Sequence, residues 1–215
     1  MFVYVYIYIY MSYKIIVSRY NENIDWLSPE MYNCIIYNKG VSLGISNEIM
    51  LLNVGRESDT YLEYIISNYN NLPDVVVFTQ ARISDHRGCD NVNYLIHIKN
   101  DALQNTKSNV VLNHYDCGNN RDWDKNWNVR GASYYLHDNY KNNNRIVFID
   151  WFKKHINSTY PNPIKIYANG IFAVKKELIL KHSVEYYKKL QLELNHHIEP
   201  AEGHFFERSW YYIFN

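Results

Sequence analysis

The chain has 215 residues, with 22 basic and 22 acidic side chains and a formal net charge of zero. This length suits one domain with a hydrophobic core, and the charge balance gives no long-range field that would draw the chain to nucleic acid or to an anionic membrane. The three cysteines, Cys34, Cys89 and Cys117, are widely spaced, so we expect no disulfide framework and a reducing compartment.

Residues 1–11 alternate tyrosine with valine or isoleucine over most of their length. They are too short to span a bilayer as a helix, and they lack the basic start and the small-residue cleavage site of a secretory signal. They suit an edge strand with tyrosines on one face. They also suit a translated TA repeat upstream of a start at Met11, in line with the AT-rich coding of many large DNA viruses. We favour the second interpretation, and we take residues 12–215 as the domain.

Two short apolar runs near the start, residues 13–17 and 34–37, predict strands that are buried on both faces of a sheet. In open α/β sheets, ligands bind beyond the carboxyl ends of the strands. The polar residues that follow the two runs are therefore candidate ligand contacts: Arg19, Asn21, Glu22, Asn38 and Lys39. For the segment after the first run, the alternative is a capped strand-to-helix turn with solvated charges.

A third short strand is expected at residues 49–52, followed by a polar loop and an amphipathic helix at residues 60–68. The loop contains Arg56 and Glu57 after a glycine, but it has neither the spacing of a dinucleotide fingerprint nor a phosphate-loop Gly-Lys-Ser/Thr. It could present backbone N–H groups and an arginine to a diphosphate. It could equally be a capped helix start with a solvated arginine.

The clearest buried strand is Val75 to Phe78, and the segment after it contains Asp85 and His86. A carboxylate and an imidazole at a strand end can hold a divalent cation, which would neutralise a leaving diphosphate. The alternative is an aspartate turn followed by a surface histidine. Far along the chain, Glu202 and His204 supply a second acid and imidazole, and a carboxylate there could act as a general base.

The rest of the chain continues the alternation of helices and strands. Residues 114–144 form a long irregular segment containing Trp123 and Trp127. The alternation predicts an α/β sandwich with a mostly parallel sheet, and it places the four polar clusters at one edge. The other expected elements are a helix at 94–103, a helix or strand at 145–154, a turn into a strand at 167–174, a long helix at 176–194 and a last helix at 205–214.

The order of these motifs resembles a family of uncharacterised proteins related to the A-type (GT-A) nucleotide-sugar glycosyltransferases, close to the capsular-polysaccharide-type members. The resemblance runs from about Lys14 to Phe214. It is carried by these segments: Ser18-Arg19-Tyr20-Asn21-Glu22 with Trp26-Leu27, Tyr37-Asn38-Lys39-Gly40, Asn53-Val54-Gly55-Arg56-Glu57-Ser58 with Thr60-Tyr61-Leu62, Phe78-Thr79-Gln80 with Asp85-His86, Asn169 to Val174, Glu202-Gly203-His204 and Glu207-Arg208.

The resemblance implies a single GT-A-like α/β/α domain that transfers a sugar from a UDP- or GDP-linked donor to a glycan or other hydroxyl acceptor. It implies nucleotide contacts from Arg19, Asn21, Glu22, Asn38, Lys39, Arg56 and Glu57. The metal, Mn²⁺ or Mg²⁺, would be held by Asp85, His86 and His204. Catalysis would fall to Glu202 and Asp85, and the acceptor would meet Asn169, Gly170, Trp123 and Trp127. We expect a cytoplasmic protein without a membrane span, in the host cytoplasm if it is viral.

The sequence departs from the family pattern at one place, because no Asp-x-Asp metal motif follows the strand at residues 75–78. That departure leaves two alternatives open. One is a GT-A-like module that binds carbohydrate or protein without catalysis. The other is a metal-dependent hydrolase of phosphate or nucleotide esters that uses Asp85, His86 and His204.

Overall fold

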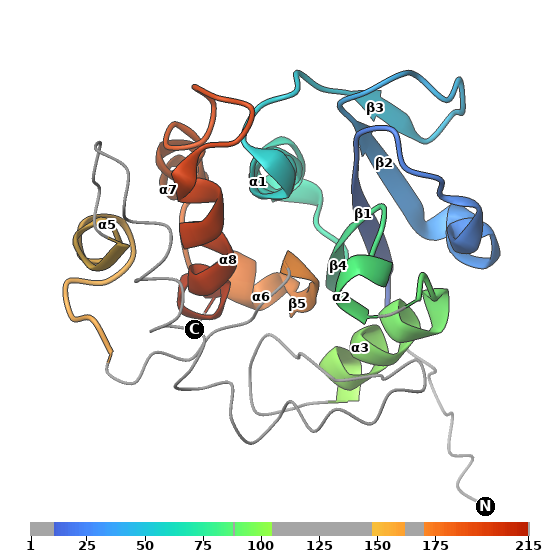
Figure 1. The fold of residues 1–215 in the computed structure, drawn as a ribbon. Coiled ribbons are helices and arrows are strands. Elements are labelled where there is room, and N and C mark those ends of the chain that lie inside the picture. The colour runs from blue at the N-terminus through green and yellow to red at the C-terminus, as the bar shows by residue number, and fades with distance from the viewer. Residues whose placement is uncertain (1–10, 88, 105–147, 162–169, 215) are drawn as a thin grey trace, which may run out of the picture.

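The protein is a mixed α/β structure built on one five-stranded sheet (Figure 1). The computed structural model describes residues 11–87, 89–104, 148–161 and 170–214. The strand order is β3-β2-β1-β4-β5, and only β5 runs antiparallel to its neighbour. The expected mostly parallel sheet is therefore confirmed. The strands are β1 (Tyr13–Arg19), β2 (Cys34–Asn38), β3 (Glu48–Met50), β4 (Val75–Gln80) and β5 (Phe172–Lys175).

Helices cover both faces of the sheet, which explains why its central strands are continuous apolar runs. One face packs against α1 (Arg56–Asn68) and α8 (Ala201–Phe214). Helix α7 (Val184–Gln191) packs against α1, and α5 (Phe148–His155) packs against α8. The other face packs against the 3-10 helix η1 (Asp25–Asn33) and α3 (Val92–Gln104). The short elements are η2 (Tyr69–Asn71), α2 (Ser84–Arg87) and α6 (Lys176–Ile179).

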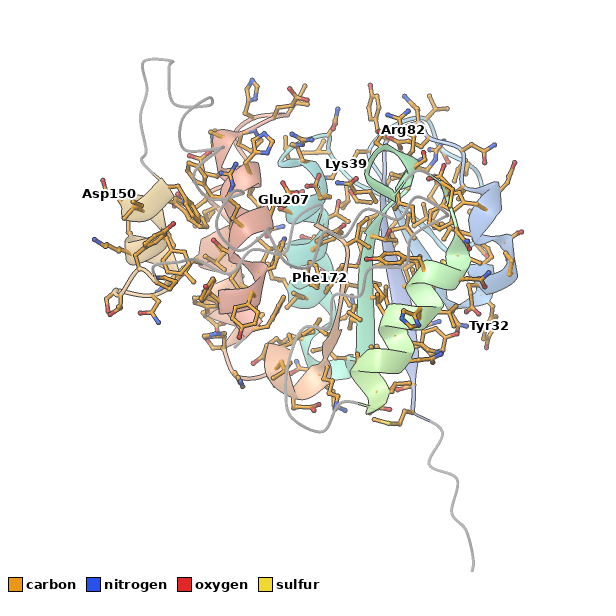
Figure 2. The ribbon with its side chains drawn as sticks, turned by 60° about the horizontal axis from the view of Figure 1, so that its bottom comes forward. Tyr32, Lys39, Arg82, Asp150, Phe172 and Glu207 are labelled. Atoms are coloured by element: carbon orange, nitrogen blue, oxygen red, sulfur yellow. The ribbon has the colours of Figure 1, made fainter. Side chains whose placement is uncertain are left out.

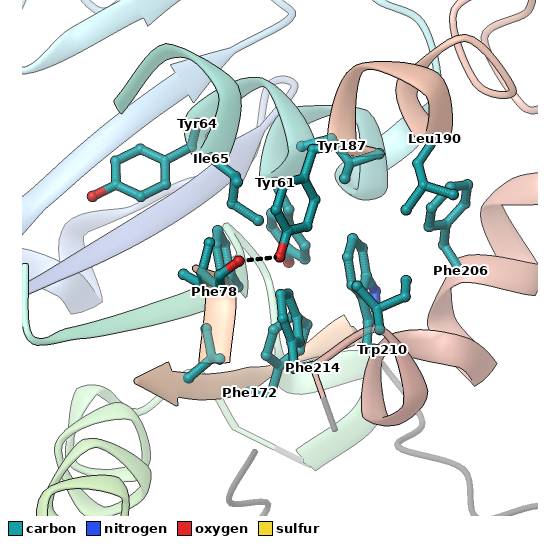
Figure 3. Close-up of a cluster of buried hydrophobic side chains, with 14 of the residues drawn as sticks. Tyr61, Tyr64, Ile65, Phe78, Phe172, Tyr187, Leu190, Phe206, Trp210 and Phe214 are labelled. Atoms are coloured by element: carbon teal, nitrogen blue, oxygen red, sulfur yellow. Dashed lines mark hydrogen bonds between the residues drawn. The ribbon is translucent and has the colours of Figure 1, made fainter. Parts of the chain in front are cut away.

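Alternate residues of β1, β2, β4 and β5 enter separate cores, as the period of a strand requires. In β4, Val76 and Phe78 face α1 and α8, whereas Val77 faces α3. The first core is largely aromatic (Figure 3). Phe172 of β5 is fully buried in it, with its ring centroid 5.1 Å from that of Phe78 and 5.4 Å from that of Trp210. This core joins the sheet to α1 and α8, which carry the polar groups described below.

Two helix boundaries differ from the sequence-based expectation. Helix α1 begins at Arg56 rather than at residue 60, because Gly55 takes a left-handed φ of 64° at its start. The long helix expected at residues 176–194 is wrong, since the chain forms α6 and then α7. The break lies at Ser183, whose hydroxyl accepts a hydrogen bond from the backbone N–H of Tyr186 and so caps α7.

The sequence predicted no disulfide framework, whereas Cys89 is disulfide-bonded in the structure and Cys34 is a buried free thiol. Wide spacing along the chain does not limit which cysteines meet in the folded state. Within the described ranges, no helix is both long and apolar enough to cross a bilayer.

Candidate functional site

The parallel strands place their carboxyl ends at one edge of the sheet, and the polar segments after them lie side by side there. The backbone N–H of Lys39, just after β2, donates to the carbonyl of Arg19 at the end of β1, over 2.8 Å. The backbone N–H of Ala81, after β4, donates to the carbonyl of Ser18 over 2.9 Å. Strand β4 lies on the opposite side of β1 from β2, so the strand order reverses at β1. This is the kind of position where open α/β sheets bind ligands.

The polar groups nearest this edge are largely engaged with one another. The guanidinium of Arg19 is buried and donates to the side chain of Asn38 and to the carbonyls of Tyr20, Glu22 and Val41. Asn38 is fully buried. Arg19 and Asn38, which the sequence predicted as nucleotide contacts, therefore hold the loops after β1 and β2 together. Their contact with a ligand stays a prediction.

The other two predicted contacts of the first loop are also engaged, Asn21 with the loop after β2 and Glu22 within its own loop. The side-chain carbonyl of Asn21 accepts from the backbone N–H of Val41 at 2.9 Å, and the carboxylate of Glu22 accepts from the backbone N–H of Tyr20 at 2.7 Å. The two loops pack so closely at Gly40 that an added Cβ would lie 1.7 Å from the carbonyl oxygen of Tyr20. Glycine is therefore required there for steric reasons.

Lys39 is a buried cation at the centre of the edge. Its ammonium donates to the carboxylate of Asp59 at 2.9 Å and to the backbone carbonyls of Arg56, at 2.7 Å, and Val54. The side chains of Lys39 and Asp59 are only 3% and 8% exposed. Burial lowers the pKa of the ammonium, and the nearby carboxylate of Asp59 counteracts that effect. All three donor positions of the ammonium are thus used inside the protein.

The start of α1 has an unusual backbone conformation. Gly55 and Arg56 both have positive φ, 64° and 52°. A left-handed conformation is common for glycine and rare for arginine, so Arg56 is held in it at a cost of about 1 kcal/mol or more. Residues in such conformations cluster at active sites and ligand clamps, which makes Arg56 a functional candidate.

Arg56 belongs to a cluster of four charged or titratable side chains, which we call the acid–base cluster: Arg56, Glu57, His204 and Glu207. The Arg56 guanidinium lies 3.4 Å from Nε2 of His204 and 3.8 Å from the carboxylate of Glu57. The other ring nitrogen of His204, Nδ1, lies 3.9 Å from the carboxylate of Glu207. The cluster joins the amino-terminal turn of α1 to the first two turns of α8, two segments about 150 residues apart in the chain (Figure 1).

Within this cluster, Glu57 has the most perturbed environment. Its side chain is 11% exposed, and burial raises the pKa of its carboxyl above the ordinary value. The charge of Glu207 raises it further, whereas Arg56 and His204 lower it. Glu207 is more exposed, at 20%. Two carboxyl groups in different environments, beside an arginine and a histidine, are a recognised arrangement for acid–base chemistry.

The turn before β5 forms one wall of the acid–base cluster. Gly170 has a φ of 58°, and a Cβ added there would lie 3.4 Å from Cγ of Glu57. The buried hydroxyl of Tyr61 donates to the carbonyl of Gly170 over 2.8 Å and fixes the position of the turn. Gly170, predicted as an acceptor contact, thus lies against Glu57. Asn169 lies outside the described residues, as do Trp123 and Trp127.

Glu202 and His204 point to different sides of α8. Residues two apart on an α-helix are separated by about 200° around its axis. The Glu202 carboxylate lies 3.8 Å from Nε2 of His196, away from the acid–base cluster that contains His204. Glu207, three residues after His204, shares its face. Glu207 was not predicted as a site residue from the sequence, although its i, i+3 spacing from His204 would have indicated it.

The predicted metal ligands do not come together among the described side chains. The carboxylate of Asp85 is paired with Arg82 at 2.9 Å, and both side chains are more than half exposed. His204 instead lies beside Arg56 and Glu207. In the described part of the chain, no group of three His, Cys, Asp or Glu side chains is placed to hold a metal ion. The side chain of His86 lies outside this part, so a metal site there stays a prediction.

Figure 2 relates these groups to the whole molecule. Lys39 and Glu207 lie toward the same end of the sheet, and Arg82 lies farther along that edge. Phe172 lies below them among the core side chains. The candidate site is therefore the acid–base cluster at the edge of the sheet, supported from below by the aromatic core.

The comparisons with known proteins place the chain in a family. Residues 15–215 match the family described as a protein of unknown function (DUF3431), and the chain belongs to that family. The comparison with curated proteins found no match, and neither did the comparison with solved structures.

Proposed function

We propose that this protein is a glycosyltransferase with a GT-A-like fold, which moves a sugar from a UDP- or GDP-linked donor to a hydroxyl acceptor. The observation that carries the proposal is the acid–base cluster at the carboxyl edge of a mostly parallel sheet. It combines a cation that suits a phosphate, Arg56, with two carboxyl groups, Glu57 and Glu207. The resemblance of the sequence motifs supports the same reaction class.

In this proposal the diphosphate of the donor binds at Arg56 and the amino terminus of α1. Arginine forms charge-assisted hydrogen bonds with phosphate oxygens, and a helix amino terminus carries unpaired N–H groups and a partial positive charge. The Arg56 side chain is 38% exposed, so its guanidinium is accessible to a ligand. His204, 3.4 Å away, is the second group that faces the same position.

The transfer step needs a base that accepts the proton of the acceptor hydroxyl. We assign this role to Glu207. The acceptor oxygen attacks the anomeric carbon and gives its proton to the Glu207 carboxylate. The bond from that carbon to the diphosphate oxygen breaks, and the diphosphate leaves with the electron pair. Burial raises the pKa of Glu57, so this carboxyl retains a proton more readily than an ordinary glutamate and limits the negative charge beside the leaving group.

The proposal is tested by nucleotide binding and by transfer. Thermal unfolding is followed with UDP, GDP and CDP and with their sugar conjugates, each with and without Mn²⁺. A ligand at a hundred times its dissociation constant stabilises the folded state by about 2.7 kcal/mol, which raises Tm by several degrees. Sugar transfer to acceptor glycans is then measured with the nucleotide that binds.

Three variants separate the roles. Arg56→Met should weaken nucleotide binding about 10- to 100-fold, the value of a lost hydrogen bond to a charged group. Glu207→Gln should keep binding but lower the transfer rate about 10²- to 10⁴-fold. Lys176→Met is the matched control, because Lys176 pairs with Asp74 at the amino end of β4, the opposite edge of the sheet.

The outcomes distinguish the alternatives. Sugar release at the same rate without an acceptor would indicate a hydrolase. Glycan binding without any nucleotide effect would indicate a binding module. Stabilisation that requires Mn²⁺ and is lost in Asp85→Ala would support the predicted metal site. No stabilisation by any nucleotide, in a folded sample, would reject the proposed transferase.

A further inference from the structure

The acid–base cluster depends on a backbone conformation that the sequence around it does not favour. Arg56 is the only non-glycine residue in the described part of the chain with a positive φ. Its carbonyl oxygen is bound by the ammonium of Lys39, which also binds the carbonyl of Val54 on the other side of Gly55. The ammonium thus holds both peptide groups that flank the turn.

Asp59 completes this arrangement from the next turn of α1. Its carboxylate accepts from Lys39 at 2.9 Å and from the side-chain amide of Gln191 at 3.2 Å. A Cβ on Gly55 would lie 2.5 Å from Cβ of Asp59 and 2.9 Å from that of Leu194, so the turn is closely packed against α1 and the segment after α7. The buried ion pair, the carbonyls and the packing all restrain the same three residues.

We infer that Lys39 and Asp59 are positioning residues, which hold residues 54–56 in the left-handed turn and so direct the Arg56 guanidinium into the acid–base cluster. Lys39 was predicted from the sequence as a nucleotide contact. Its three donors are instead used on Val54, Arg56 and Asp59, so it acts on a ligand through Arg56. The ligand-binding part of this inference rests on the proposed function, whereas the positioning part does not.

The first measurement needs no ligand. The Nε–Hε resonance of Arg56 is assigned in a ¹⁵N-labelled sample by its disappearance in Arg56→Lys. In the wild type we expect a shifted signal from a guanidinium held beside Glu57 and His204. In Lys39→Met it should move to the position typical of solvated arginines. It should stay in place in Val77→Ala, a destabilising control in the other core, on the α3 face of the sheet.

An unchanged Arg56 resonance in Lys39→Met would overturn the inference. Removing one member of a buried ion pair is strongly destabilising, so this variant could fail to fold. The double variant Lys39→Met, Asp59→Leu removes both charges together and retains apolar volume, which is far better tolerated. It also removes the bonds to the two carbonyls, so the same shift of the resonance is expected from it.

The second measurement is a double-mutant cycle with UDP or GDP as the probe, whichever binds the wild type. If Lys39 acts through Arg56, Lys39→Met and Arg56→Met each raise the dissociation constant about tenfold, and the combined variant raises it no further. Independent effects, about a hundredfold in the combined variant, would show that Lys39 acts by another route and overturn the inference. If neither nucleotide binds the wild type, the proposed function fails, and the resonance of Arg56 alone decides the positioning role.

Discussion

Replacing Tyr61 with phenylalanine removes one oxygen atom that links the aromatic core to the candidate site. The hydroxyl of Tyr61 donates to the carbonyl of Gly170 over 2.8 Å, and both residues are buried. The ring itself keeps its contacts with Phe78 and Phe172, at centroid distances of 4.8 and 5.9 Å. Tyr61→Phe therefore isolates the contribution of one hydrogen bond.

The expected loss of stability follows from the acceptor that is left behind. A buried carbonyl that loses a donor costs about 1–3 kcal/mol when water does not replace the bond. For a chain of this size, 1 kcal/mol changes Tm by about 2–4 °C, so a loss of about 1–3 kcal/mol in Tyr61→Phe should lower Tm by about 2–12 °C. Urea unfolding followed by tryptophan fluorescence gives the free energy directly.

Tyr187→Phe is the matched control. The hydroxyl of Tyr187 is also buried and donates to a backbone carbonyl, that of Ile179, at 2.7 Å, but the carbonyl belongs to α6 rather than to the candidate site (Figure 3). We expect similar losses of stability from the two variants. Only Tyr61→Phe should also weaken nucleotide binding, because only Gly170 borders Glu57.

Two results would refute this reasoning. A loss of less than about 0.5 kcal/mol in Tyr61→Phe would show that the carbonyl of Gly170 finds another donor. Equal effects of Tyr61→Phe and Tyr187→Phe on nucleotide binding would show that the turn at Gly170 does not shape the site.

Three further predictions each concern a single residue. Burial raises the pKa of Glu57 in the folded state, so the unfolded chain loses this proton at lower pH. This carboxyl therefore lowers stability as pH rises from the ordinary value of 4.5 toward its raised value in the folded state. Glu57→Gln should raise Tm more at pH 7 than at pH 4, and equal gains at both pH values would contradict the raised pKa. Glu48 behaves in the opposite way: the backbone N–H of Leu43 and other donors lower its pKa to about 2, so its stabilising effect is present above its ordinary pKa of 4.5 and is lost as pH falls toward 2. Acid unfolding of Glu48→Gln should therefore show a shallower loss of stability between those pH values, and an unchanged profile would exclude this role. Gly55→Ala should lower the free energy of unfolding by about 1–3 kcal/mol, measured in urea, because of its left-handed φ and the clash with Asp59; a neutral effect would mean that the turn can relax.

The sequence was a good guide to the sheet and to its polar edge. The runs at Val75–Phe78 and Ile15–Val17 are apolar at every position because helices cover both faces of the sheet. They therefore do not show the alternation of apolar and polar residues that is typical of half-exposed strands. Once these strands are parallel, their carboxyl ends lie at the same edge. The meeting of Arg19 with Asn38 and of Lys39 with Arg56 follows from that geometry.

The composition of the acid–base cluster could be predicted only in part. Arg56, Glu57 and His204 were proposed from their motifs. Glu207 was not, and Glu202 was proposed in its place, although it faces His196. A sequence motif contains residues that are adjacent in the chain, whereas the 3.6-residue period of the helix decides which of those residues lie on the same face.

The sequence by itself determined the alternation of strands and helices and the edge at which the polar groups gather, because apolar periodicity and strand direction are local properties of the chain. Only the tertiary structure decided that β5 runs antiparallel, that Lys39 is engaged with Asp59 and two carbonyls, and that Arg56 is left-handed beside His204. These features arise from contacts between residues 15 to 148 positions apart. No local pattern encodes such contacts, since they depend on how the covered faces of the sheet bring distant helix ends together.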